Sequence, residues 1–144
     1  MSLEEISELG MSAIGECNCG EVSYKVEGEL SDVFVCHCSI CRKSTGSGGI
    51  AVTLVKGSAF EWLSGKDYIV KWSKPNHDWH TFFCKICGSI LPGGNDETQM
   101  YIPVGTLSSG HEKLKVAHHL YTNSKANWEV IGDCGKQHPD GYGS

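Results

Sequence analysis

Apolar and polar residues alternate strictly from Glu21 to Gly28, which is the period of a strand that buries one face. Further short runs of β-branched and aromatic residues follow, separated by turn sequences such as Ser64-Gly65. These runs lie at 31–36, 49–55, 59–63, 68–72, 79–83, 99–105 and 116–121. Strands of this length and spacing predict a mainly β fold of twisted antiparallel sheets, with few short helical turns.

Three local patterns add detail to this prediction. The loop 28–30 is short enough for a hairpin between the strands on either side of it. Pro103 predicts that its strand lies at a sheet edge, because proline cannot donate a ladder hydrogen bond. Residues 2–12, with Ser2 as a candidate N-cap and Glu5 three positions later, predict a short helix or a loose tail.

A chain of 144 residues is expected to form a single domain. We place an N-terminal tail or short helix at 1–12, the β domain at 13–131 and a polar C-terminal tail, fraying towards its end, at 132–144. An apolar share of 40% implies a modest hydrophobic core. The 18 glycines raise the entropic cost of ordering the backbone on folding. Additional cross-links are therefore expected.

Eight cysteines can supply these cross-links, as disulfides or as metal ligands. The acidic segment 1–6 lacks the apolar run of a secretory signal, so we expect a cytoplasmic protein with reduced thiols. Clustered cysteines then favour metal binding. No stretch is apolar enough to cross a bilayer, which predicts no membrane association. A formal charge of -5 with scattered lysines and arginines argues against nucleic-acid binding.

The densest group of candidate ligands is Cys36, Cys38 and Cys41, whose spacing lets a tight turn bring three sulfurs round one zinc ion. Three protein ligands leave one tetrahedral position open to substrate, as in catalytic zinc sites, whereas structural sites have four. A histidine, either His37 or a remote one such as His119, would instead close this group into a second structural site. His37 is expected to point away, because it lies between two ligands in an extended segment.

Two further pairs, Cys17/Cys19 and Cys84/Cys87, lie far apart in the chain. Several pairings are open, but two short pairs commonly close one tetrahedral site, which predicts a structural zinc on these four residues. Gly88 stands where such a turn needs positive φ. Cys84 and Cys87 also have the spacing of a thioredoxin-like redox pair, although no βαβ pattern surrounds them.

The remaining candidates have simpler interpretations. Cys134 lies in a polar segment and is expected to be a lone thiol. Surface or hydrogen-bonded positions are expected for His77, His80, His111, His118 and His138. Core or half-buried strand positions are expected for Trp62, Trp72 and Trp79.

Four motifs, in this order and spanning nearly the whole chain, resemble the glutathione-dependent formaldehyde-activating enzyme family, which also includes centromere protein V. They are Gly-x-Cys-x-Cys-Gly at 15–20, Cys-His-Cys-x-x-Cys-Arg-Lys-x-Thr-Gly at 36–46, Phe-Cys-x-x-Cys-Gly-Ser at 83–89 and His-Leu-Tyr-x-x-Ser-Lys-Ala-x-Trp at 119–128. The resemblance implies twisted β-sheets of the β-tent type. One departure is Asn127, where family members often carry proline before the tryptophan.

The resemblance also implies two zinc sites. The structural zinc would be bound by Cys17, Cys19, Cys84 and Cys87, and a second, labile zinc at the active site by Cys36, Cys38 and Cys41. The activity implied is that of a carbon-sulfur lyase, which joins formaldehyde to glutathione as S-hydroxymethylglutathione or carries out the reverse reaction.

Chemistry supports this assignment for the central three cysteines. Zinc with three thiolates can bind an incoming thiol and lower its pKa, so that the thiolate adds to an aldehyde. Three thiolates make zinc a weak Lewis acid, which disfavours hydrolysis. The candidate substrate-binding residues are the cations Arg42 and Lys43, the loop residues Thr45 and Gly46, and the wall residues Lys125 and Trp128.

Two alternatives stay open from the sequence. Arg42 and Lys43 are equally consistent with an ordinary solvated pair. The whole protein is also consistent with a binding module that has two structural zinc sites and no turnover. Substituting a cysteine from each cluster separates these readings, because only a structural ligand is needed for folding.

Overall fold

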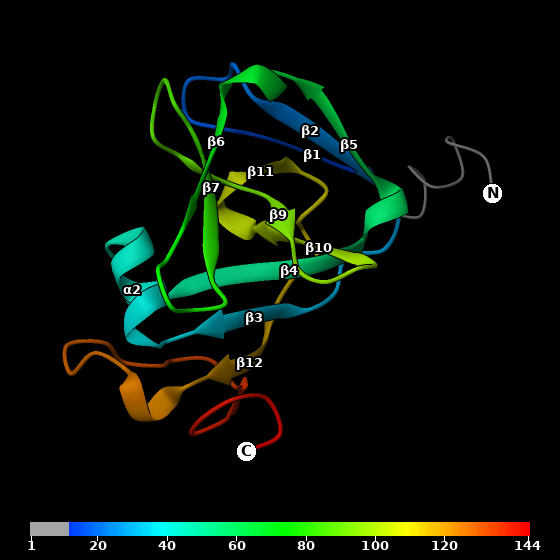
Figure 1. Ribbon diagram of the computed structural model, residues 1–144. Helices are drawn as coiled ribbons and strands as arrows, with labels where there is room; N and C mark the ends of the chain where they lie inside the picture. Colours follow the sequence, from blue (N-terminus) through cyan, green and yellow to red (C-terminus); the bar gives the residue numbers. More distant parts are fainter. Residues whose placement is uncertain (1–11) are drawn as a thin grey trace.

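The computed structural model describes residues 12–144, which form three sheets (Figure 1). Sheet A, in the order β11-β1-β2-β5, contains β1 Ser12–Glu16, β2 Ser23–Glu27, β5 Phe60–Ser64 and β11 Leu107–Ser109. Sheet B, in the order β13-β12-β3-β4-β10-β9, contains β3 Val33–Cys36, β4 Ile50–Lys56, β9 Gly93–Gly94, β10 Gln99–Pro103, β12 Val116–Leu120 and β13 Lys136–Gln137. Sheet C, in the order β6-β7-β8, contains β6 Ile69–Ser73, β7 His80–Cys84 and β8 Ile90–Leu91.

Helical segments are short in the described part of the chain. The α-helix α2 spans Ser39–Thr45, and 3-10 turns occur at η1 Gly57–Ala59, η2 Lys66–Tyr68, η3 Val104–Thr106 and η4 Thr122–Ser124. Among residues 12–144, no helix has the length and hydropathy to span a membrane. The prediction of a mainly β fold with few helical turns is confirmed. The helix considered for 2–12 lies outside the described residues, apart from Ser12, which begins β1.

Alternation in β2 places its apolar residues in the core as predicted. Val22, Tyr24 and Val26 are fully buried, while the residues between them are only partly covered. One core cluster joins sheets A and B and contains Ala13, Tyr24, Val26, Val55, Ile102 and Leu107. A second joins sheets A and C and contains Cys17, Val22, Cys84 and Leu91. Two of the cysteines are therefore part of the packed interior.

The hairpin predicted across 28–30 does not form. β2 pairs with β1 and β5 in sheet A, whereas β3 pairs with β4 and β12 in sheet B. Val26 and Val33 are both buried, and the loop lets their strands pack in different sheets. Sheet B also departs from the antiparallel expectation, because β12 runs parallel to both β3 and β13.

One expectation about a sheet edge is wrong, and the C-terminal segment adds a strand that the sequence did not indicate. Pro103 does not lie on an edge strand, because β10 runs between β4 and β9. Its ring is tolerated because β9 pairs only with Met100 and Tyr101 and ends before reaching it. The polar segment 132–144 contributes to the fold, since β13 adds to sheet B and His138 is 1% exposed.

The arrangement leaves one face of sheet B open beside sheet C. Residues directly opposed on neighbouring strands of a sheet share a face, so Cys36, Ile50 and Leu120 lie on the same side of sheet B. Val52 and Pro103 are opposed to each other on that side too. Figure 1 shows the β6–β7 hairpin and α2 standing beside the same end of β4. This corner brings the central cysteines close to a hollow surface.

Candidate functional site

The four cysteines Cys17, Cys19, Cys84 and Cys87 come together as predicted, with all their sulfur atoms within 4.8 Å of one another. Sγ of Cys19 lies 3.5 Å from that of Cys17 and 3.8 Å from that of Cys84. Tetrahedral zinc with bonds of about 2.3 Å requires sulfurs about 3.8 Å apart. The cluster therefore fits a four-coordinate metal ion.

Local hydrogen bonds orient this quartet. The Val22 amide donates to the Cys17 sulfur at 3.4 Å, and the Ser89 hydroxyl lies 3.2 Å from the Cys87 sulfur. The Ser89 hydroxyl and amide lower the pKa of Cys87 to about 5. Gly88 has φ of 77°, which confirms that the turn needs a residue free to adopt the left-handed region. The quartet thus has supported thiolates on a rigid turn.

The trio Cys36, Cys38 and Cys41 also forms a cluster, with its three sulfurs within 4.8 Å of one another. Cys36 ends β3, Cys38 is the N-cap of α2, and Cys41 lies in its first turn. The Cys38 sulfur accepts a hydrogen bond from the Cys41 amide at 3.4 Å. Sequence reasoning expected only a turn here and missed the helix. Its one signal was Gly46, which follows two basic residues and caps α2 with φ of 67°.

The three thiols of the trio are electronically coupled. A hydrogen bond with the Cys41 thiol lowers the pKa of Cys36 to about 6, against an opposing effect of burial. The same hydrogen bond, followed by burial, raises the pKa of Cys41. Cys36 and Cys38 are partly exposed, whereas Cys41 is buried. The trio is therefore a soft three-sulfur donor set with access from one side.

No fourth cysteine, histidine or acidic ligand joins the trio among residues 12–144. His37 points away from it, as predicted, and is fully buried. Both ring nitrogens of His119 are also occupied, by His37 at 2.8 Å and by the Asp133 carboxylate at 2.9 Å. The alternative in which a histidine closes the site is therefore not the arrangement in this structure.

These two histidines form a chain of hydrogen bonds that the sequence did not reveal. Nδ1 of His37 lies 3.2 Å from Oε2 of Glu129, Nε2 of His37 meets Nδ1 of His119, and Nε2 of His119 meets Asp133. The hydrogen bond from His119 lowers the pKa of Asp133. Glu129 also packs on Gly48, where an added Cβ would lie 2.3 Å from its carboxylate oxygen. The segment 119–133 is thereby tied to the residue between two trio cysteines.

Of the predicted substrate-binding residues, the cations Arg42 and Lys43 have the positions most compatible with ligand binding. Both are on α2, directly after Cys41. Lys43 is exposed and lines a cavity beside the helix. Nε of Arg42 is buried with no hydrogen-bond partner among the described residues, which leaves it available to an additional polar group.

The other four predicted substrate residues have different positions. The amide of Gly46 caps α2 by donating to the Arg42 carbonyl, and the Thr45 hydroxyl contacts the Cys41 carbonyl, so both are occupied in the helix end. Lys125 donates to the carbonyls of Ala126 and Glu129. Trp128 is 71% exposed. Neither Lys125 nor Trp128 lines the two cavities described next, and their role as pocket walls stays a prediction.

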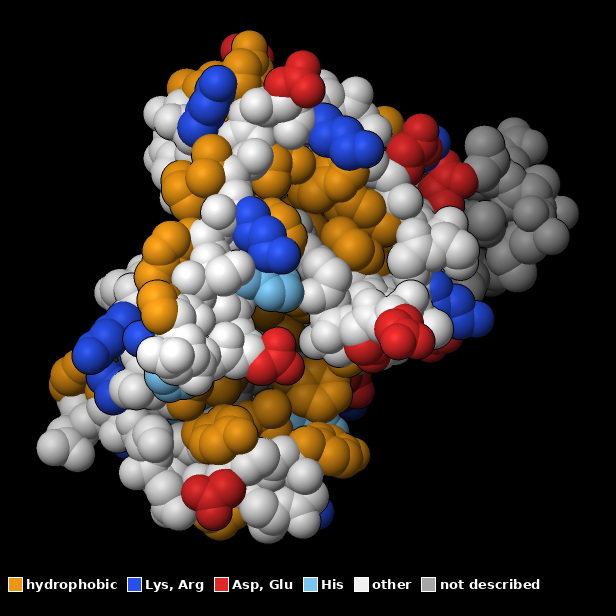
Figure 2. Space-filling view, in the orientation of Figure 1, with side chains coloured by type: hydrophobic (Ala, Val, Ile, Leu, Met, Phe, Trp, Pro, Cys, Tyr) orange, Lys and Arg blue, Asp and Glu red, His pale blue; other side chains and the backbone are white. Residues whose placement is uncertain are grey.

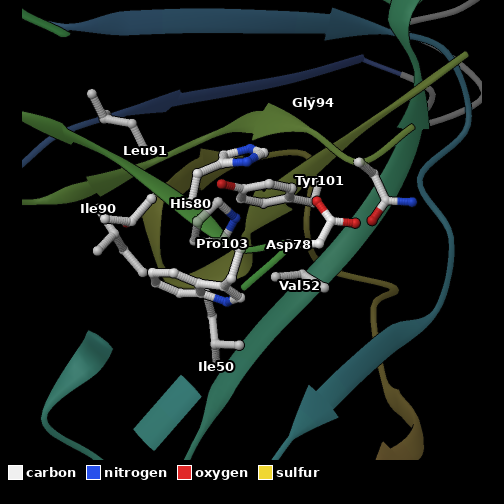
Figure 3. Close-up of a pocket in the computed structure, with 12 residues that line it drawn as sticks. Ile50, Val52, Asp78, His80, Ile90, Leu91, Gly94, Tyr101 and Pro103 are labelled. Carbon is white, nitrogen blue, oxygen red and sulfur yellow. The ribbon is translucent and has the colours of Figure 1, made fainter. Parts of the chain in front are cut away.

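Two cavities lie beside α2 and β4, and no cysteine of the trio lines either of them. The first, which we call the α2 cavity, has a volume of about 570 Å³ and is lined by Ser39, Ile40, Lys43 and Ser44 of α2 and by Trp72, Lys74, His77, Trp79 and Thr81 of the β6–β7 hairpin and its loop. The second, the β4 cleft, has a volume of about 250 Å³ and lies between β4, β7, β8 and β10 (Figure 3). Trp79 and Thr81 line both.

Sequence reasoning missed the hairpin's part in this surface. Trp72 was expected to be core or half-buried, but it is 49% exposed and makes an edge contact with Trp79. Lys74 and His80 drew no functional attention, because only the packing of sheet C beside sheet B and α2 places them on the walls of these cavities. The available signal was two tryptophans either side of a polar turn. Cys134 is exposed and free, outside both clusters.

Comparisons with known proteins agree with the sequence motifs. The profile of the family described as "Glutathione-dependent formaldehyde-activating enzyme" matches residues 12–124. A protein of Halomonas elongata, whose name proposes such an enzyme, is 46% identical over 41 residues, which are 28% of this chain and 26% of that protein. This match thus spans about a quarter of the relative's length.

A crystal structure of a Rhodobacter sphaeroides protein shares the fold. It has a TM-score of 0.55 and 22% sequence identity, and the match covers 67% of this chain and 88% of that one. Such identity supports the fold alone. Because the family profile extends over most of the chain, including both cysteine clusters, the protein belongs to the glutathione-dependent formaldehyde-activating enzyme family.

Proposed function

We propose that this protein is a zinc-dependent carbon-sulfur lyase that interconverts a thiol and an aldehyde with their adduct, of which S-hydroxymethylglutathione is the simplest example. The observation that carries the proposal is the trio: three sulfurs gathered on one side, with no fourth ligand among the described residues. A closed structural site would need four ligands. A cytoplasmic location, where thiols stay reduced, belongs to this proposal.

Cys36, Cys38 and Cys41 would hold the zinc ion, since their sulfur spacing suits a soft metal. When bound there, zinc would supply an open position that accepts a thiol and favours its thiolate form. The protein's own part is to orient these sulfurs. The amide of Cys41 does so for Cys38, and the buried His37 anchors the chain between Cys36 and Cys38.

In the proposed reaction the thiol sulfur forms a bond to the aldehyde carbon, and the carbonyl π bond opens. The thiol proton ends on the resulting hydroxyl group, so RSH and R′CHO give RS–CH(OH)R′ without an oxidant or reductant. The reverse reaction returns the proton to sulfur. The protein accelerates both directions equally, because a catalyst leaves the equilibrium unchanged.

The α2 cavity is suited to the thiol. Glutathione carries two carboxylates, and Lys43 and Lys74 provide two cations on opposite sides of this cavity. Its volume of about 570 Å³ falls within the range of small-molecule sites. Ser39 and Ile40, which lie between Cys38 and Cys41, also line it. Because Cys38 and Cys41 lie on another face of α2, a thiol bound here would extend its sulfur end past the start of the helix to reach the trio.

Exchange spectroscopy by NMR tests the proposal. In a mixture of glutathione and formaldehyde, the zinc-loaded protein is expected to broaden or exchange the signals of S-hydroxymethylglutathione faster than buffer does. Cys38→Ser protein that retains its fold serves as the control and is expected to match buffer. If the exchange rate with wild-type protein equals the rate in buffer alone, the lyase activity is rejected and the protein is a binding module.

Substituting the lysines tests how the thiol is recognised. Lys43→Gln and Lys74→Gln are each expected to raise KM for glutathione about fivefold, or about 1 kcal/mol, with less effect in high salt. Lys66→Gln, an exposed lysine on η2, is the matched control. Equal KM values for all three variants and wild type would contradict the assignment of the α2 cavity.

A further inference from the structure

The β4 cleft differs in chemistry from the α2 cavity, although the two meet at Trp79 and Thr81. Its lining is mainly apolar, from Ile50, Val52, Trp79, Ile90, Leu91 and Pro103. No lysine or arginine lines it, and Asp78 contributes a carboxylate. Figure 2 shows acidic, histidine and Lys or Arg side chains around hydrophobic ones where this face is hollowed. The residues that line the cleft itself, with one carboxylate and no cation, favour an apolar and uncharged group.

The cleft begins next to the trio. Ile50 lies directly opposite Cys36 in the β3–β4 ladder, so the two side chains share a face of sheet B. Val52 and Pro103, one pleat further along that face, continue the floor. A molecule whose reacting carbon lies beside the trio can thus extend its substituent over Ile50 and Val52.

The volume of the cleft exceeds what formaldehyde needs. A water molecule takes up about 30 Å³ in the liquid, and an apolar cavity of about 150 Å³ holds benzene. At about 250 Å³, the β4 cleft has room for an aromatic ring and a short linker. Formaldehyde, with two heavy atoms, would leave most of this apolar surface in contact with water.

The far end of the cleft offers a phenolic hydrogen-bond donor. Tyr101 lies there beside His80, with ring centroids 6.5 Å apart (Figure 3). Its hydroxyl makes no hydrogen bond to another described residue. Burial raises the pKa of Tyr101 to about 12, so this hydroxyl keeps its proton at neutral pH. It can donate to a neutral oxygen at the end of a ligand.

We propose that the β4 cleft binds the substituent of the aldehyde, and that the preferred aldehyde is uncharged and aromatic or branched rather than formaldehyde. The proposal rests on the proposed function, because the aldehyde and thiol meet at the trio. The thiol's carboxylates belong in the α2 cavity with Lys43 and Lys74, and the neutral aldehyde belongs in the cleft with Asp78. The bond changes are those given above, with R′ an apolar group.

Filling the cleft tests this assignment. Val52→Phe places a ring in the cleft floor and is expected to lower the accelerated exchange of glutathione with phenylacetaldehyde at least tenfold, while exchange with formaldehyde changes less than twofold. The matched control is Val130→Phe at an 87% exposed valine, which is expected to change neither. Equal loss with both aldehydes, or no loss with either, would overturn the proposal.

Reversing the charge at the cleft provides a second test that does not disturb packing, because Asp78 is exposed. Asp78→Lys is expected to increase exchange with glyoxylate, a carboxylated aldehyde, about fivefold relative to phenylacetaldehyde. Asp67→Lys, at an exposed aspartate on η2, is the control and is expected to leave the ratio unchanged. An unchanged ratio in Asp78→Lys protein would contradict the proposed role of the cleft.

A binding measurement separates this inference from the proposed function. 2-Phenylethanol cannot form the adduct, but it is expected to bind to wild-type protein and change its tryptophan fluorescence through Trp79, and at least tenfold more weakly to Val52→Phe protein. If exchange with every aldehyde equals buffer while 2-phenylethanol binds in this way, the lyase fails and the apolar site stands. If formaldehyde exchange is accelerated but 2-phenylethanol does not bind, the lyase stands and the apolar site is rejected.

Discussion

The two cysteine clusters differ in how far apart in the chain their ligands lie. The quartet joins a turn after β1 to a turn after β7, and 65 residues separate Cys19 from Cys84. The trio takes all its ligands from the short segment that joins β3 to α2. A metal ion in the quartet would therefore link sheets A and C, whereas one in the trio would link nothing distant.

This difference assigns the two sites different physical roles. Closing a long loop removes much conformational entropy from the unfolded chain, and Cys17 and Cys84 also belong to a core cluster. The trio closes a loop of a few residues, so metal bound there adds little to the stability of the whole domain. An incomplete ligand set with little structural benefit is the arrangement expected of a reactive site.

The largest effect is expected from breaking the quartet. Cys87→Ser removes one ligand from a site whose metal binding is worth about 10–16 kcal/mol in small zinc domains at pH 7. That exceeds or equals the typical stability of a whole domain. The variant is expected to lose its cooperative thermal transition and its β-sheet circular dichroism. A cooperative melt like that of wild type would show that the quartet is dispensable.

Breaking the trio is expected to separate metal content from folding. Cys38→Ser should bind one metal ion fewer per chain than wild type, as measured by native mass spectrometry. It should lose the accelerated exchange while keeping its β-sheet spectrum. Cys134→Ser, at the exposed cysteine outside both clusters, is the control and should retain both metal ions. Unfolding of Cys38→Ser as complete as that of Cys87→Ser would make both sites structural.

The hydrogen-bonded histidines are expected to tune the trio by a smaller amount. Glu129→Gln weakens the contact that holds His37, and with it the backbone between Cys36 and Cys38. Removing partners that orient ligands typically costs tenfold to a hundredfold in metal affinity, and we expect about tenfold here. Competition with a chelator measures it, with Glu97→Gln, an exposed glutamate, as the control. If Glu129→Gln protein binds metal as tightly as wild type, Glu129 has no role in orienting the trio.

The smallest effect is expected at Asp133, whose pKa is lowered by the hydrogen bond from His119. A carboxylate with a lowered folded-state pKa stabilises the protein above its unfolded-state pKa, and this stabilisation is lost as the pH falls through the lowered value. Asp133→Asn should therefore be slightly less stable than wild type at pH 7 and lose less stability on acidification below about pH 4. If the urea midpoints of wild type and Asp133→Asn differ by the same amount at every pH, the proposed contribution of the Asp133 carboxylate to stability is contradicted.

Much of the fold follows from local sequence. The alternation at 21–28 predicts β2 and its buried face, and the runs around β4 to β7 predict those strands within a residue or two. Both metal clusters are also predicted by cysteine spacing, because short spacings restrict geometry wherever the chain goes. What spacing did not predict was α2, since a seven-residue helix depends on its caps and packing.

Pairings between distant segments were decided only in the folded protein. The loop at 28–30 leads to a different sheet, β12 lies parallel to β3, and the last segment adds β13, because each buries a face that no local pattern identifies. The histidine chain and the β4 cleft belong to the same category: their residues come from remote strands and loops. The sequence by itself indicated which cysteines gather into clusters that could hold a metal ion, and the packing of sheet C beside sheet B decided which side chains line the neighbouring cavities.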